Sequence, residues 1–401
     1  MSGTGRGRRG RWSMPRRRRS VPLGLRALGG FRVLGVGLWA SLAITHPVSL
    51  SAQTSGPPSY LVFVASSRED FITLVRFTPN VALIEHRTPI SLDSAERAAP
   101  QGVSVAPDGR HYYVTTARGF PNGELLKVAI AGDSSRMMSQ PPDTVKGREP
   151  LEAGPAAVQV SPDGAYAWIA NASAAADGAS SISVVYLEEM VEVTRIPTCS
   201  VAQGSRFTAD GSRHYSVCMH DDLLVEIDVP RMAVSRRLTV APGAEPGASN
   251  VAAAHGACGP TWAEPSADGA KVYVACSQSN EVVEVDVAAW QVTRRMATGD
   301  GAYQLASTHN GKLLICTNQR GQSVSVVDLA TGRELARLPT KRPGPAGVVT
   351  SPDDHFAFVS VAGTGSQPGT VEIINLDTLK TVGTIDVFPG AGGIGFWKLG
   401  N

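Results

Sequence analysis

The 401-residue sequence predicts an all-β fold, a seven-bladed β-propeller made of four-stranded antiparallel blades. Three observations support this fold: one turn motif recurs between apolar runs, further alternating runs follow it, and the two ends of the sequence complete one more unit. The composition agrees, because 42 glycines and 27 prolines with only 18% charged residues suit short strands joined by many turns. Internal repeats of this length are typical of propellers.

A hairpin opens each repeat. Its turn follows the pattern Ser-Pro-Asp-Gly and stands between two runs of alternating apolar residues. Asp-Gly is a strong hairpin signal, because glycine accepts a positive φ and aspartate bonds its own backbone. Asp354 replaces the glycine of the last copy, so we expect that turn to be strained or of another type. The six copies span 103–115, 158–170, 205–218, 263–276, 305–317 and 348–360.

Further strands follow the hairpin in each repeat. Their apolar residues alternate with period two, which predicts antiparallel strands with one buried face. The third strands are expected at 124–130, 181–187, 223–229, 281–287, 323–329 and 370–376. The fourth strands are expected at 191–198, 233–240, 291–298, 334–340 and 381–387.

The two ends of the propeller sequence supply the seventh blade. The runs 60–66, 71–77 and 81–90 match strands two to four of a unit, and strand one is missing there. The last run, "GGIGFWKLG" at 392–400, matches strand one and nothing more. Joined in one sheet, these runs close the ring and remove its exposed edge.

The stretches "SPDGAYAWIANAS" and "SSISVVYLEEMVEVTRIPT" resemble the YVTN family of β-propeller repeats. The resemblance covers most of the chain after residue 52, and it departs from the pattern where second strands end in "VTTA", "SVCM", "VACS" and "ICTN". It implies a propeller of a group that includes bacterial surface and periplasmic proteins and shares its fold with 6-phosphogluconolactonase-like enzymes. It assigns no functional residue, since one fold hosts many activities.

The N-terminal segment has the pattern of an export signal. An arginine-rich stretch without acidic residues precedes the apolar run "VLGVGLWASLAI" at 33–44, and small residues follow. We assign 1–52 to a signal peptide and 53–401 to a single propeller domain, which predicts a periplasmic or secreted protein. The apolar run is short for a membrane span, although an uncleaved anchor is the alternative. No later apolar stretch predicts a span after cleavage.

Charge excludes one class of partner. The formal net charge of +2 arises from the basic N-terminal segment, and the remainder of the chain is acidic. Nucleic-acid binders neutralise phosphates with a basic surface, so we expect no nucleic-acid partner.

Four of the five cysteines have matched positions. Cys199 and Cys258 each precede a first strand, and Cys218 and Cys276 each end the following second strand. The start of one strand lies beside the end of the next in a hairpin, so we predict the disulfides Cys199–Cys218 and Cys258–Cys276. Buried thiols are the alternative. Cys316 is expected to be free.

No metal or cofactor is predicted. The segments 218–222 ("CMHDD") and 255–258 ("HGAC") hold soft ligands, but their spacing favours polar loops over a zinc or copper site. Three histidines that follow turns are expected to face solvent, namely His111, His214 and His355. The sequence contains no zinc motif, nucleotide-binding loop or Gly-x-Ser-x-Gly elbow.

The starts of the first strands are expected to converge on one mouth of the central channel. There a polar and aromatic arc faces small residues in the other blades, which makes it the predicted ligand site. Trp262 and Tyr303 can stack on a flat ligand, and Gln203 and Gln304 offer amides. Packing of Trp262 between blades is the alternative. The predicted ligand-binding residues are Gln203, Thr261, Trp262, Tyr303 and Gln304.

Arg206 and Glu264 share a register two residues further along neighbouring first strands. They are the candidate catalytic residues, since together they offer an acid–base group and a cation. A mutual ion pair that supports blade packing is the interpretation we favour. The long connections 131–155 and 241–260 both precede first strands, so we expect both at the same face as the predicted mouth.

The absence of a recognisable catalytic cluster favours a non-enzymatic binding or interaction scaffold, monomeric and exported. Its partner is an unidentified protein, peptide or small ligand, bound at one mouth of the channel. The alternative is a lactonase-type hydrolase of a sugar or related lactone. A third hypothesis is an accessory to a periplasmic redox or quinoprotein system.

Overall fold

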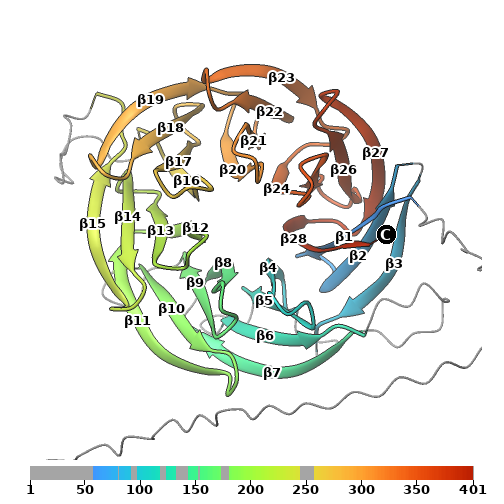
Figure 1. Ribbon diagram of the computed structural model, residues 1–401. Coiled ribbons are helices and arrows are strands. Elements are labelled where there is room, and N and C mark those ends of the chain that lie inside the picture. The colour runs from blue at the N-terminus through green and yellow to red at the C-terminus, as the bar shows by residue number, and fades with distance from the viewer. Residues whose placement is uncertain are drawn as a thin grey trace, which may run out of the picture. The chain divides into compact units, whose positions relative to one another are not determined.

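The computed structural model describes residues 57–79, 81–91, 97–117, 123–131, 143–151, 154–172, 180–243 and 257–400. These residues form 28 strands and no helix. The strands build seven four-stranded antiparallel sheets set as blades around a central channel (Figure 1), so the predicted propeller is confirmed. In the described residues no helix is long and apolar enough to cross a membrane. The predicted signal peptide, residues 1–52, lies outside the described part.

Blade 1 closes the ring. From the channel outwards it contains β28 (Ala391–Gly400), β1 (Ser59–Ser66), β2 (Phe71–Thr78) and β3 (Val81–Pro89). The last strand of the chain pairs with the first, with Val64 opposite Ile394 in an antiparallel register. The predicted pairing of the two ends is therefore confirmed, and β28 covers the edge of β1 that would otherwise face the channel.

The other blades each use one continuous stretch of chain. Blade 2 contains β4 (Pro100–Val105), β5 (His111–Thr116), β6 (Gly123–Ala129) and β7 (Thr144–Leu151). Blade 3 contains β8 (Pro155–Val160), β9 (Tyr166–Asn171), β10 (Ser180–Tyr186) and β11 (Val191–Cys199). Blade 4 contains β12 (Ala202–Phe207), β13 (Arg213–Cys218), β14 (Leu223–Asp228) and β15 (Ala233–Thr239).

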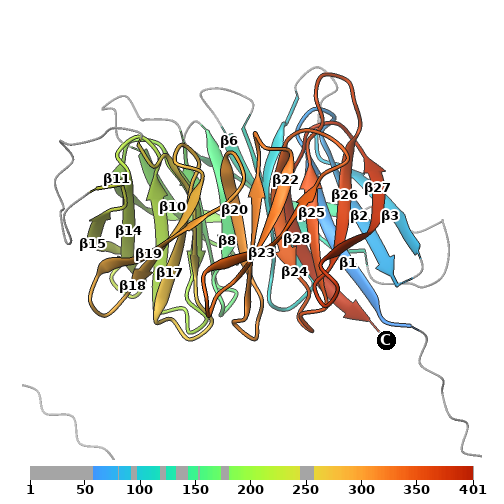
Figure 2. The ribbon, with the colours of Figure 1, turned by 90° about the horizontal axis from the view of Figure 1, so that it is seen from above.

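Blade 5 contains β16 (Pro260–Pro265), β17 (Lys271–Cys276), β18 (Glu281–Asp286) and β19 (Gln291–Ala297). Blade 6 contains β20 (Ala302–Ser307), β21 (Leu313–Asn318), β22 (Ser323–Asp328) and β23 (Arg333–Pro339). Blade 7 contains β24 (Pro345–Thr350), β25 (Phe356–Val361), β26 (Gly369–Asn375) and β27 (Lys380–Val387). The strands run between the two faces of the ring (Figure 2), so every inner strand begins at one face and ends at the other.

The strand β7 corrects the expectation for the connection 131–155. Its sequence, "TVKGREPL", lacks apolar alternation because Gly147 and Pro150 interrupt it, yet it forms the outer strand of blade 2. The residues before it therefore join the third strand to the fourth, and not the fourth strand to the next blade. β6 ends and β7 begins at the face opposite to the predicted mouth, and residues 132–142 between them lie outside the described part. The connection 241–260 joins β15 to β16, as expected, and its residues 244–256 lie outside the described part.

The core lies between the blades. Inner and middle strands of neighbouring blades bury their apolar faces against each other, as in the cluster of Trp168, Ile182 and Val225 from blades 3 and 4. The expectation for His214 is wrong, because its side chain is fully buried in this wall. Its ring lies 4.8 Å from the ring centre of Trp168 and 4.7 Å from that of Phe207. The alternation of β13 places His214 on the face of blade 4 that packs against blade 3, and not in the exposed turn before the strand.

Candidate functional site

The channel has a different pocket at each end. The narrow mouth lies where the inner strands begin and encloses about 120 Å³ around Gln203, Trp262 and Tyr303. The wide mouth lies where the inner strands end and encloses about 410 Å³ around Glu264 and His309. Arg206 lines both pockets, so its side chain lies between them. The larger pocket is thus at the face opposite to the predicted ligand site.

All five predicted ligand-binding residues line the narrow mouth. Thr261 and Gln304 are buried, whereas Gln203, Trp262 and Tyr303 are half-buried. Alignment of the repeats was sufficient to bring these residues together, because every blade starts its inner strand at the same height. The predicted arc of polar and aromatic residues is present, and the hydrogen bonds of its polar atoms determine which of them can contact a ligand.

Side-chain hydroxyls join neighbouring blades at the narrow mouth. The starts of several inner strands leave the ladder at a bulge, which exposes a backbone N–H and a carbonyl. The Thr115 hydroxyl accepts a hydrogen bond from the Gly102 N–H at 2.9 Å and donates one to the Ala156 carbonyl of the next blade at 2.5 Å. Thr317 and Ser360 make the same bridge in blades 6 and 7.

Thr261 makes the equivalent bridge in blade 5. Ala275 occupies the position in β17 that Thr115 occupies in β5, and it has no hydroxyl. The Thr261 hydroxyl instead donates to the Tyr303 carbonyl of the next blade at 2.7 Å. The side chain of Thr261 is only 3% exposed, so this polar group belongs to the contact between blades 5 and 6.

Trp262 packs against the neighbouring blade. A Cβ placed on Gly204 would lie 1.9 Å from the Trp262 ring, so the indole lies directly on this glycine. Its Nε1 donates to Glu264 at 3.4 Å. The packing between blades that was one interpretation of Trp262 is therefore present, and one face of the ring is covered by protein. Burial raises the pKa of the Tyr303 hydroxyl, which keeps this group neutral.

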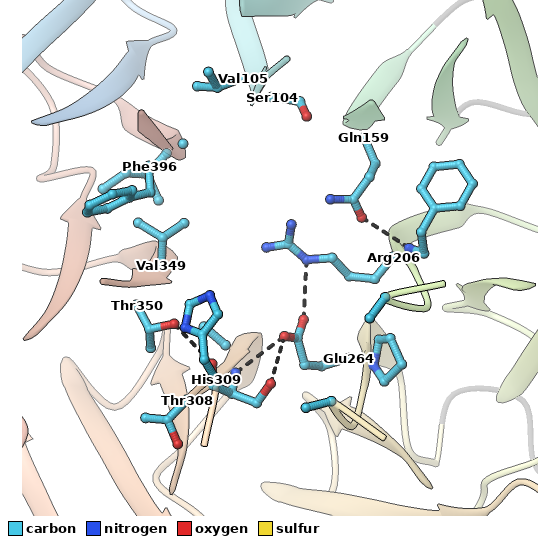
Figure 3. A pocket seen from close by; sticks show the side chains of 18 of the residues that line it. Ser104, Val105, Gln159, Arg206, Glu264, Thr308, His309, Val349, Thr350 and Phe396 are labelled. Carbon is cyan, nitrogen blue, oxygen red and sulfur yellow. Dashed lines mark hydrogen bonds and ion pairs between the residues drawn. The ribbon is translucent and has the colours of Figure 1, made fainter. Parts of the chain in front are cut away.

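Arg206 and Glu264 form the expected ion pair across blades 4 and 5, with Nε and Oε2 3.2 Å apart (Figure 3). The second carboxylate oxygen accepts hydrogen bonds from the Ser307 N–H at 3.3 Å and the Ser307 hydroxyl at 3.2 Å. Together with the Trp262 indole these partners occupy both oxygens of Glu264. This carboxylate is accordingly a fixed support for Arg206 and not an open general base.

The guanidinium of Arg206 reaches into the wide mouth (Figure 3). Its contact with Glu264 uses Nε, and its two terminal nitrogens make no hydrogen bond or ion pair to the described residues. The guanidinium carbon also lies 5.2 Å from the ring centre of Trp262, which adds a cation–π contact. The planar fork is therefore held in place while its donor end faces open space, the arrangement that binds carboxylates and phosphates.

A histidine–aspartate pair lies at the rim of the wide mouth. Asp354 Oδ1 is 3.2 Å from Nδ1 of His309, and the Asp354 carboxylate also accepts hydrogen bonds from the N–H groups of His309 at 2.6 Å and Asn310 at 2.9 Å. His309 Nε2 makes no hydrogen bond to the described residues. The carboxylate thus fixes the imidazole through one nitrogen and leaves the other for a ligand.

Asp354 is the residue that replaces the turn glycine. Its φ is 61°, in the region that glycine adopts at the other turns, and its N–H bonds the Ser351 carbonyl at 3.0 Å. The turn therefore keeps its type and is strained, as one of the two expected outcomes. The replacement of the repeat's turn glycine by Asp354 was the one feature of the sequence that could have pointed to the His309–Asp354 pair. Its partner His309 comes from blade 6, which sequence reasoning could not place.

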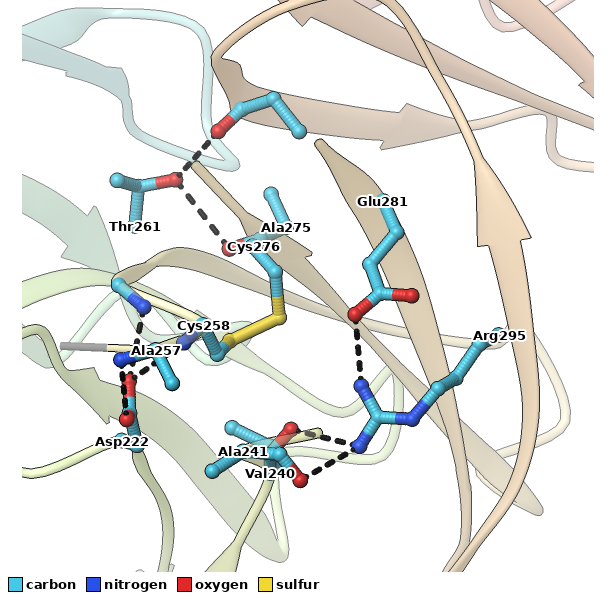
Figure 4. Close-up of a disulfide and its surroundings, with 12 residues drawn as sticks. Asp222, Val240, Ala241, Ala257, Cys258, Thr261, Ala275, Cys276, Glu281 and Arg295 are labelled. Atoms are coloured by element: carbon cyan, nitrogen blue, oxygen red, sulfur yellow. Dashed lines mark hydrogen bonds and ion pairs between the residues drawn. A yellow bond between two sulfur atoms is a disulfide. The ribbon is translucent and has the colours of Figure 1, made fainter. Parts of the chain in front are cut away.

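Both predicted disulfides are present. Cys199 and Cys218 have Cα atoms 5.9 Å apart and connect blades 3 and 4, and Cys258–Cys276 lies within blade 5 (Figure 4). Asp222 supports the second bridge, because its carboxylate accepts hydrogen bonds from the N–H groups of Ala257, Cys258 and Gly259. Two disulfides indicate an oxidising compartment.

Among the remaining thiol and the possible metal ligands, His255 lies outside the described residues. Cys316 is free and fully buried, and burial raises the pKa of its thiol to about 12. Cys218 and Cys258 are unavailable as thiolate ligands, since both are oxidised. In the part of the chain that the structure describes, no three His, Cys, Asp or Glu side chains gather in a way that could hold a metal ion.

Neither the known protein-family models nor the curated proteins include a match to this chain. Many solved structures share its fold. A putative 6-phosphogluconolactonase of Bacteroides uniformis is 14% identical with a TM-score of 0.65, and the match covers 84% of this chain and 99% of the other. The periplasmic gluconolactonase of Pseudomonas aeruginosa is 17% identical with a TM-score of 0.66, covering 85% and 99%.

The hydrazine synthase of Kuenenia stuttgartiensis also contains this fold, at 16% identity and a TM-score of 0.55, with 81% of this chain and 94% of that chain covered. Proteins with different names and activities thus share the architecture. At these identities the likeness shows the propeller fold alone, and the pockets carry the evidence on function.

Proposed function

We propose that this chain is an exported propeller with YVTN-type repeats that binds a small anionic molecule in the wide mouth, with Arg206 as its anchor. The observation that carries the proposal is the state of the Arg206 guanidinium, which Glu264 fixes through Nε and whose two terminal nitrogens bond none of the described residues. A pocket of about 410 Å³ lies within the usual size of small-molecule sites. The two disulfides support export.

The polar groups of the narrow mouth support this placement indirectly. The Thr261 hydroxyl joins two blades, and the Gln304 amide donates to the Val348 carbonyl at 3.4 Å. Gln203 and Tyr303 remain as candidate ligand contacts there, but the cavity is about 120 Å³. We therefore expect the anion at the wide mouth.

Binding of gluconate and glucuronate, measured by calorimetry beside uncharged glucose, tests the proposal. We expect Arg206→Ala to weaken binding of both acids by about tenfold or more, because a charge-assisted hydrogen bond is lost. Arg206→Lys should restore part of the affinity, since an ammonium keeps the charge and loses the fork. Arg333→Ala, a change at an exposed arginine on the outer strand of blade 6, should leave binding unchanged.

Equal binding of the acids by the wild type and the Arg206→Ala variant would contradict the proposal. Loss of binding in Gln203→Ala and Tyr303→Phe, with Arg206→Ala unaffected, would move the ligand to the narrow mouth.

Hydrolysis of a lactone is the second candidate, and the His309–Asp354 pair favours it. His309 Nε2 would take a proton from a water molecule whose oxygen adds to the lactone carbonyl carbon. The ring C–O bond then breaks, the proton passes to the departing alkoxide, and the product is a hydroxy acid. Arg206 would stabilise the developing oxyanion and then bind the product carboxylate.

Turnover of glucono-lactone and related sugar lactones by residues 53–401 tests this candidate. We expect His309→Gln to abolish turnover. Asp354→Gly restores the residue type of the other turns and removes the carboxylate, so it should lower kcat about tenfold and leave KM unchanged. No turnover above buffer by the wild type, with anion binding intact, would leave a binding protein.

A further inference from the structure

A groove between blades 5 and 6 continues the wide mouth towards the outside of the ring. It encloses about 610 Å³ on the face that carries the hairpin turns. The groove and the wide mouth share a wall formed by Ser266, Ala267, Ser307 and His309. The groove and the wide mouth are therefore neighbours, and a ligand anchored at Arg206 would pass over these residues to reach the groove.

Tyr273 supplies an open hydroxyl in this groove. The side chain is only 3% exposed, and its hydroxyl makes no hydrogen bond to the described residues. Tyr215, the equivalent residue of blade 4, donates to Glu226 at 3.1 Å. The corresponding carboxylate in blade 5, Glu284, is bonded instead to Lys271, Thr293 and Arg294. Burial raises the pKa of Tyr273 to about 12, so the hydroxyl stays protonated and can donate.

Charged groups of both signs line the same groove. The exposed Lys312 ammonium makes no hydrogen bond or ion pair to the described residues. Asp268 and Asp328 each use one carboxylate oxygen, Oδ1, to hold their own turns. Their second oxygens accept no hydrogen bond from the described residues. The groove thus offers a cation and two acceptors at its turns, and a neutral donor on the neighbouring strand β17.

We propose that this groove is a subsite for the further sugar units of an acidic oligosaccharide whose first carboxylate binds Arg206. Lys312 binds a later carboxylate, and sugar hydroxyls, which both donate and accept, bond Tyr273, Asp268 and Asp328. An acidic peptide fits less well, because its glutamate and aspartate side chains carry no hydroxyl groups that could donate to Asp268 and Asp328. The proposal deepens the proposed function and rests on it for the position of the first unit.

Calorimetry at constant ionic strength with galacturonate and its dimer and trimer tests this assignment. We expect affinity to rise with chain length in the wild type. Lys312→Ala should weaken trimer binding about tenfold and leave monomer binding unchanged, and Tyr273→Phe should weaken the trimer by a smaller factor. Lys380→Ala, at an exposed lysine on the outer strand of blade 7, is the matched control and should change neither.

The two proposals can fail separately. Monomer binding that needs Arg206 but does not improve with chain length would overturn the groove and leave the anion site. Trimer binding that needs Lys312 but not Arg206 would support the groove and overturn the anchor. Tighter binding of triglutamate than of the trimer, with the same dependence on Lys312, would overturn the assignment to a sugar.

Discussion

The two mouths of the channel are built from the same seven inner strands, yet their polar groups have opposite roles. At the narrow mouth the strands approach so closely that hydroxyls and glycines join the blades, as Thr115 and Gly102 do. At the wide mouth the inner strands end and the turns begin, so side chains such as Arg206 and His309 face a larger space. A ring of polar residues around a channel is therefore not by itself a ligand site.

The difference arises from how the backbone is satisfied. Bulges at the strand starts leave backbone groups that must find partners away from water, and side chains supply them. At the strand ends the ladder is regular, so no bulge exposes backbone groups there. The side chains of Arg206 and Glu264 can therefore bond each other, and the terminal N–H groups of Arg206 remain as donors. Three predictions test this contrast.

The largest effect is expected from close packing at the narrow mouth. A Cβ on Gly393 would lie 2.2 Å from the Gln101 carbonyl oxygen, whereas a Cβ on the adjacent Gly392 would meet its nearest atom at 3.8 Å. Gly393→Ala should therefore lower the free energy of unfolding by about 3 kcal/mol. Gly392→Ala should change it by less than about 0.5 kcal/mol. Urea unfolding of both variants measures the difference, and equal values would contradict the close approach.

The second effect concerns His214, which is buried between blades 3 and 4. Burial lowers the pKa of His214 to about 3, against 6.5 in the unfolded chain, so the folded protein holds a neutral ring. The stability that this gives is complete above pH 6.5 and is lost as the pH falls towards 3. His214→Phe removes this dependence. Between pH 7 and pH 5 we expect the free energy of unfolding of the wild type to fall by about 2 kcal/mol relative to that of the variant.

Comparing urea unfolding of the two proteins at several pH values isolates His214, because other titrating groups are common to both. A difference that does not change with pH would mean that the ring is charged or hydrated in the folded state.

The smallest effect concerns a hydroxyl bridge. Thr261→Val leaves the Tyr303 carbonyl without its 2.7 Å partner and should lower the free energy of unfolding by about 1 kcal/mol. Adding Ala275→Thr, which places a hydroxyl where blades 2 and 6 carry one, should recover part of the loss. Gluconate binding should be unchanged in both variants. A loss of gluconate binding with unchanged stability would make Thr261 a ligand contact after all.

Much of the fold could be predicted from the sequence because its signals are local. The alternation of apolar residues and the Asp-Gly turns define each hairpin, and the incomplete units at the two ends define the closure. The disulfides followed from matched positions in neighbouring repeats. The strand β7 was missed because "TVKGREPL" has no apolar alternation, so its place in blade 2 depends on pairing with β6.

The sequence by itself determined the repeat, the ring and the residues that encircle the predicted mouth, because each depends on position within one blade. Only the tertiary structure decided which mouth holds open polar groups. His309 and Asp354 come from different blades, and Glu264, from the blade next to that of Arg206, holds the guanidinium through Nε while its donor end faces the wide mouth. The burial of His214 has the same cause, since the neighbouring blade supplies the rings that cover it. Contacts between blades therefore distinguish structural polar groups from available ones.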